Sequence, residues 1–199
     1  MVEPYDGNPE SVGAGTAVDQ QRLVNMMNML DVRGAVVLVV ALVATVTDVR
    51  TRRIPNWLTF GAALAALAYS AYEGGFAEAG TSAAGWLAGA ALFFPFFALG
   101  GMGAGDVKLL AALGAWLGPW QTLWLAVFAG IAGGVLGVAV AVTQGYFQTA
   151  VTNLWVMLMH WRTQGLEPVP GVTLKDGKSP RLAYAIPITI GVLCTLWRR

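Results

Sequence analysis

Gly101-Met-Gly-Ala-Gly-Asp-Val-Lys108 places a glycine cluster, an acid and a base between two long apolar runs. These runs are residues 87–99 and 107–117, and Asp106 lies at the start of the second. A charged group in hydrocarbon costs at least about 2.5–3.5 kcal/mol, so an acid beside a membrane span is a candidate functional residue. Asp48 ends another apolar run in the same way. The two aspartates are therefore the first candidates for a functional site.

The composition indicates a membrane protein. Of the 199 residues, 56% are hydrophobic and 12% are charged, whereas soluble domains carry about 25% charged residues. Such a chain cannot cover itself with a solvated surface. We therefore predict an all-α, polytopic integral membrane protein with about six transmembrane helices and the lipid bilayer as its surroundings. No basic run suits a nucleic acid, so no nucleic-acid partner is expected.

The alternation of apolar runs and charged loops predicts the topology. Residues 1–30 are expected to form a polar N-terminal tail, and residues 31–199 a membrane-embedded domain. Three arginines follow the first span, and basic residues concentrate in cytoplasmic loops, so this loop is assigned to the cytoplasm. An outward-facing loop is expected at 73–82. The expected spans are 34–47, 57–72, 83–99, 106–117, 120–142 and 182–197.

Residues 145–181 carry several cations and are assigned to the cytoplasmic side. Apolar residues recur at helical spacing in their first part, which predicts an interfacial helix; a seventh span is the competing interpretation. In the fifth span Gly130, Gly134 and Gly137 share one helix face and are expected to allow close helix packing. A homo-oligomer is compatible with the sequence.

In this topology both aspartates lie at the cytoplasmic ends of their spans. Paired carboxyl groups suit aspartic hydrolysis, because two adjacent acids cannot both ionise. The ionised acid then activates water as a general base, while the protonated acid serves as a general acid. This chemistry needs no metal. Gly103 and Gly105 would let the backbone approach closely beside Asp106. Ahead of the second span, Pro55 is expected to close the arginine loop and Asn56 to cap the next helix.

These residues resemble a known family. Gly103-Ala-Gly-Asp106 with Val-Lys-Leu109, together with Asp48-Val-Arg50 and Arg53-Ile-Pro-Asn56, is similar to the type IV prepilin peptidases, membrane aspartic proteases of the GxGD kind. The resemblance covers roughly residues 35–145, with a weaker echo at 182–191. It implies a catalytic dyad of Asp48 and Asp106 at the cytoplasmic face of the inner membrane.

The resemblance also implies a substrate. Members of this family remove a short leader from prepilin or pseudopilin precursors, and related enzymes process preflagellins. Longer members carry a domain with paired CxxC motifs and methylate the new N-terminus, whereas this chain has the single cysteine Cys194. It therefore resembles the short, peptidase-only form found with tight-adherence pili or with archaeal preflagellin processing, and no N-methyltransferase activity and no cofactor are expected.

Other features receive simpler interpretations. Lys108 is two residues from Asp106 and should point away from it on a helix, so an interfacial contact is expected. His160 is the only histidine and lacks a second ligand at useful spacing, so no metal site is expected. The competing function is a proton- or cation-coupled transporter subunit that uses the same acids. Structural alternatives are a helix-capping role for Asp106 and a counter-ion role for Asp48 beside Arg50 or Arg52.

Overall fold

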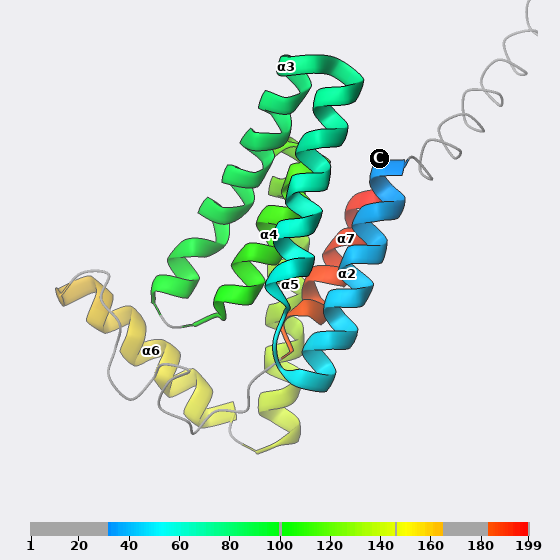
Figure 1. Cartoon of the computed structure of the whole chain (residues 1–199). Coiled ribbons are helices and arrows are strands. Elements are labelled where there is room, and N and C mark those ends of the chain that lie inside the picture. Colours follow the sequence, from blue (N-terminus) through cyan, green and yellow to red (C-terminus); the bar gives the residue numbers. More distant parts are fainter. Residues whose placement is uncertain (1–31, 100, 146, 165–182, 199) are drawn as a thin grey trace, which may run out of the picture.

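The computed structural model describes residues 32–99, 101–145, 147–164 and 183–198 (Figure 1). This part of the chain is helical and contains no strand, which confirms the predicted all-α class. The predicted tail and the stretch 165–181 lie outside the described residues. The helices are α2 (Val32–Thr51), α3 (Asn56–Ala98), α4 (Ala104–Leu117), α5 (Pro119–Thr143), α6 (Phe147–Gln164) and α7 (Ala185–Trp197).

Three helices of the described part, α2, α3 and α5, are long and apolar enough to cross a membrane, and α7 is a shorter apolar helix. The 43-residue α3 reverses direction at Gly74 and Gly75, and Figure 1 shows its two arms side by side. Gly75 has a φ of 63°, a conformation that a side chain would strain. The chain reversal predicted within 73–82 is therefore present, but the predicted loop length is wrong, because only Gly74 and Gly75 leave the helical conformation. Helix-forming residues continue up to these two glycines, and the reversal needs no longer loop.

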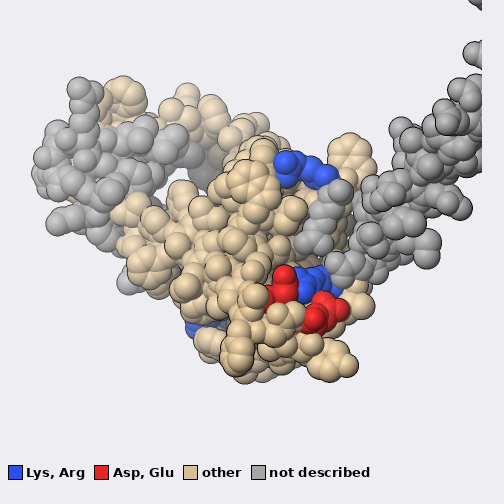
Figure 2. All heavy atoms as spheres, turned by 90° about the horizontal axis from the view of Figure 1, so that it is seen from above, with Lys and Arg blue, Asp and Glu red and all other residues tan. Residues whose placement is uncertain are grey.

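One ion-paired cluster ties the start of α2 to the turn of α3. Arg33 donates to Glu73 at 3.2 Å and to Glu78 at 3.3 Å. Figure 2, which views the molecule from this end, shows acidic and basic side chains adjoining amid an otherwise mostly uncharged surface. Both acids of the α3 turn thus pair with one arginine of the neighbouring helix.

The helix α4 is enclosed by protein. Every residue from 109 to 117 is buried, and α4 packs chiefly against α3. On one arm of α3 the carbonyl oxygen of Ala62 accepts the Nε1–H of Trp116 at 2.8 Å. On the other arm a Cβ added to Gly89 would lie 2.6 Å from the carbonyl oxygen of Leu110. The 14 residues of α4 extend about 21 Å, less than the roughly 30 Å of a hydrocarbon core. Because residues 109–117 are all buried, protein surrounds α4 over most of its length.

The helix α7 packs against both α5 and α2. Close approach to α5 occurs at Gly191, where an added Cβ would lie 2.9 Å from the backbone nitrogen of Ala129. The predicted close packing at Gly130, Gly134 and Gly137 is wrong within the described chain, because an added Cβ there would meet nothing within 4 Å. The inward face of α5 is set by the position of α7, which glycine spacing alone does not specify.

The helix α6 lies beside one end of the bundle in Figure 1. It forms the first part of the predicted segment 145–181 and contacts α5. It is not among the helices long and apolar enough to cross a membrane. The interfacial placement stays a prediction.

Candidate active site

Asp48 lies in the last turn of α2 and is turned inward, with 9% of the residue exposed. Its Oδ2 accepts the backbone N–H of Ala185, the first residue of α7, at 3.3 Å. The first N–H groups of a helix have no partner within that helix, so the carboxyl group satisfies one of them. Asp48 is thus held by a residue 137 positions away in the chain.

The chain turns sharply after Asp48. Arg52 has a φ of 54°, and its N–H donates to the carbonyl oxygen of Asp48 at 2.8 Å, which ends α2. Ile54 then packs against the glycine cluster: a Cβ added to Gly105 would lie 3.3 Å from the Ile54 Cβ. The small side chain at 105 therefore lets the arginine loop approach the start of α4.

Asp106 lies in the first turn of α4 and is 8% exposed. Its Oδ2 accepts the N–H of Gly103 at 3.2 Å, and its own N–H donates to the Gly103 carbonyl oxygen at 3.2 Å. An acid at this end of a helix is favoured by the helix dipole. The predicted capping role is thus present, and it leaves the second carboxyl oxygen available for other contacts. A Cβ at Gly103 would lie 3.0 Å from Oδ2, so glycine suits this close turn.

Lys108 connects α4 to the start of α3. Its Nζ donates to Oδ1 of Asn56 at 3.1 Å and lies 5.5 Å from the centre of the Phe60 ring. The predicted capping role of Asn56 is wrong. Pro55 occupies the N-cap position, and no side-chain hydrogen bond caps this end. The side-chain amide oxygen of Asn56 instead accepts a hydrogen bond from Lys108 of α4.

The fold brings the two predicted acids together. Asp48 acts electrostatically on Asp106, and both are buried at the same end of neighbouring helices. The counter-ion role of Asp48 beside Arg50 or Arg52 stays a prediction. The two acids form a pair of buried carboxyl groups at this end of the bundle.

Sequence reasoning missed the contribution of α7. Tyr184, just before α7, interacts electrostatically with Asp106, and Ala185 holds Asp48. The available signal was Thr45, which lies one turn before Asp48 on the same face of α2. A polar residue on the buried face of a span predicts an interhelical contact. Its partner could not be read from the sequence.

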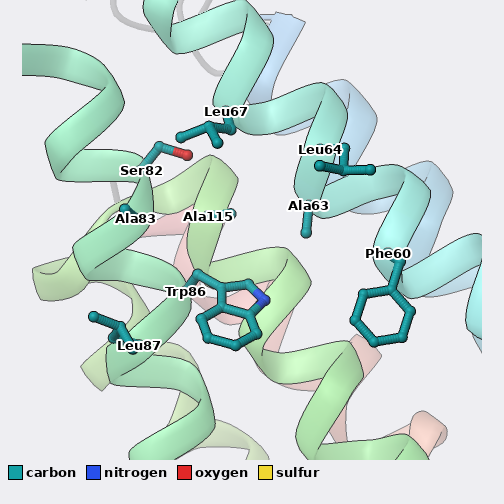
Figure 3. A pocket seen from close by; sticks show the side chains of 9 residues that line it. All are labelled: Phe60, Ala63, Leu64, Leu67, Ser82, Ala83, Trp86, Leu87 and Ala115. Carbon is teal, nitrogen blue, oxygen red and sulfur yellow. The ribbon is translucent and has the colours of Figure 1, made fainter. Parts of the chain in front are cut away.

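An apolar groove of about 440 Å³ lies between the arms of α3 and over Ala115 of α4 (Figure 3). It contains the buried Ser82, whose hydroxyl has no hydrogen-bond partner in the described structure. Neither aspartate lines this groove, which is separate from the carboxyl pair. The groove lining is Phe60, Ala63, Leu64, Leu67, Ser82, Ala83, Trp86, Leu87 and Ala115.

Among the described residues no three His, Cys, Asp or Glu side chains are grouped to hold a metal ion.

Comparison with known protein families matches residues 35–138 to the type IV leader peptidase family. Comparison with curated proteins and with solved structures gives no match. The matched segment includes both aspartates, the arginine loop and the glycine cluster, and it covers more than half of the chain. With its apolar helices, this makes the chain a membrane protein and a protease. The chain belongs to the type IV leader peptidase family.

Proposed function

We propose that this protease is an aspartic endopeptidase in which Asp48 and Asp106 are the catalytic pair. The observation that carries the proposal is that two buried carboxyl groups, carried by separate helices, interact electrostatically with each other. Two acids placed side by side are the arrangement that aspartic hydrolysis requires.

The pair acts on a water molecule. Because adjacent like charges repel, the two acids share one proton, and one stays ionised. The ionised carboxylate takes a proton from the water as it attacks the peptide carbonyl carbon, and the protonated acid donates to the carbonyl oxygen. Collapse of the tetrahedral intermediate breaks the C–N bond, and a proton passes to the leaving amine. The helix contacts at Gly103 and Ala185 keep each carboxyl group in place during these steps.

The substrate class follows from family membership and from the charges near the pair. We propose that the chain removes the short basic leader of a prepilin-like or preflagellin-like precursor at the cytoplasmic face of the inner membrane. Arg50, Arg52 and Arg53 occupy the same end of the bundle as the pair, which supports a cytoplasmic orientation. The apolar segment that follows the leader would then enter the bilayer beside the site.

The position of the acids weighs against the transporter alternative. A proton or cation path usually has its acids near the bilayer midplane. Asp48 is in the last turn of a span-length helix, and Asp106 is in the first turn of α4. Both are therefore at helix ends and away from mid-helix positions.

Co-expression of the full chain with a prepilin of the tight-adherence type tests the proposal. Asp48→Asn and Asp106→Asn keep side-chain size and should abolish the mobility shift that marks leader removal on a gel, while the protein still accumulates in the membrane. Glu78→Gln is the matched control, because it makes the same acid-to-amide change at the α3 turn. It should process normally. Wild-type processing by either aspartate variant would refute the catalytic pair.

A further inference from the structure

The helix α7 reaches both carboxyl groups through consecutive residues. Tyr184 interacts electrostatically with Asp106, and the Ala185 N–H donates to Asp48. The family match ends at residue 138, so Tyr184 and Ala185 lie outside the matched segment. The contact with Asp48 depends on how α7 is aligned along α2, and this alignment needs a structural cause.

Two threonines align the helices. The hydroxyl groups of Thr45 and Thr189 lie 2.7 Å apart, and Thr189 also donates to the carbonyl oxygen of Ala41 at 3.1 Å. Thr45 is in addition 3.1 Å from the carbonyl oxygen of Ala185. Thr189 is buried, with 8% exposed. In apolar surroundings a hydroxyl group needs such partners, so these contacts favour one alignment of α7 over its neighbours.

The same face of α2 carries the catalytic candidate. Ala41, Thr45 and Asp48 are spaced four and three residues apart, so they lie in one row along the helix. Opposite them, Ala185 and Thr189 are four residues apart on α7. Sliding α7 by one residue would move its first N–H by about 1.5 Å. That is more than a hydrogen bond to Asp48 tolerates.

We propose that Thr189 is a positioning residue for catalysis, which through Thr45 fixes the alignment of α7 and so holds the Ala185 N–H on Asp48. The inference rests on the proposed function of Asp48. Thr189 acts on the chemistry only through this contact. Because reacting groups must be held within a fraction of an ångström, loss of the alignment lowers the rate of the chemical step more than it weakens substrate binding.

Purified full-length variants, assayed for cleavage of a tight-adherence-type prepilin in detergent, test the proposal. Thr189→Val keeps the side-chain shape and removes the hydroxyl group. Thr195→Val is the matched control, because Thr195 is also buried in α7 but its hydroxyl donates only to Gly191 of the same helix. We expect Thr189→Val to lower kcat at least about tenfold with little change in KM. Thr195→Val should stay near wild type, and Thr189→Ser, which restores the hydroxyl group, should recover most of the activity.

The outcomes separate this inference from the proposed function. If Asp48→Asn is inactive while Thr189→Val and Thr195→Val have equal kcat, the positioning role is refuted and the catalytic pair stands. An increase in KM at unchanged kcat would also refute it, because the residue would then act in binding. If Asp48→Asn cleaves at the wild-type rate, the proposed function fails and the positioning role fails with it. A Thr189→Ser variant as slow as Thr189→Val would also refute the positioning role, because restoring the hydroxyl group would then not restore activity.

Discussion

Substituting alanine for Gly89 should disturb the proposed active site from a distance, through the packing of α3 on α4. A Cβ at this position would lie 2.6 Å from the Leu110 carbonyl oxygen and 2.8 Å from the Ala111 Cα. Relaxing the closer contact to an ordinary separation of about 3.4 Å requires the helices to part by roughly 0.8 Å. Leu110 is one helical turn after Asp106, so the shift moves that carboxyl group relative to Asp48.

Two consequences are expected for Gly89→Ala. Overpacking of this kind typically costs about 1–3 kcal/mol, so the midpoint of thermal unfolding in detergent should fall. Displacement of a reacting group by about 1 Å can cost about 100-fold in rate, so prepilin cleavage should fall at least about tenfold, even well below the unfolding midpoint. Both quantities can be measured on the same purified sample.

Gly61→Ala is the control for this prediction. Gly61 is in the other arm of α3, and an added Cβ there would meet nothing within 4 Å. The change should leave cleavage unaltered and stabilise the helix by about 0.5–1 kcal/mol. Equal unfolding midpoints and equal cleavage rates for the two variants would refute the packing argument. A lowered midpoint with full cleavage would refute the link between this contact and the position of Asp106.

The remaining predictions concern two further contacts. Trp116→Phe removes the 2.8 Å hydrogen bond to the Ala62 carbonyl oxygen and should lower the free energy of unfolding by about 1 kcal/mol, as measured by chemical denaturation; an unchanged value would contradict this. Gly133→Ala would place a Cβ 2.9 Å from the Tyr184 hydroxyl oxygen and should slow prepilin cleavage by displacing that side chain. Gly134→Ala meets nothing within 4 Å and should cleave normally, so equal slowing of the two would count against a role for Tyr184.

The sequence contained enough to predict the helical class and the two acids. Long apolar runs in lipid must satisfy their own backbone hydrogen bonds, which makes helices the expected structure. An acid at the end of such a run is conspicuous because burial of charge is costly. Family membership was equally accessible, since its signature lies in short local motifs around Asp48 and Asp106. The catalytic role of these acids stays a prediction.

Other features depended on pairings that no local pattern encodes. Asn56 was expected to cap its own helix, yet its amide contacts Lys108 of α4, because the packing of α4 on α3 brings the two residues together. The glycines expected to mediate packing on α5 face outward. Gly133, which no spacing rule singled out, lies against Tyr184.

Local chemistry thus determined by itself that the chain is helical and which acids stand at helix ends, because hydropathy and charge act residue by residue. Only the tertiary structure decided that α7 completes the surroundings of the two acids. Its contact with Asp48 joins residues 137 positions apart, and it depends on the alignment of α7 on α2. Such an alignment results from many small contacts acting together, and it exists only once the helices have packed.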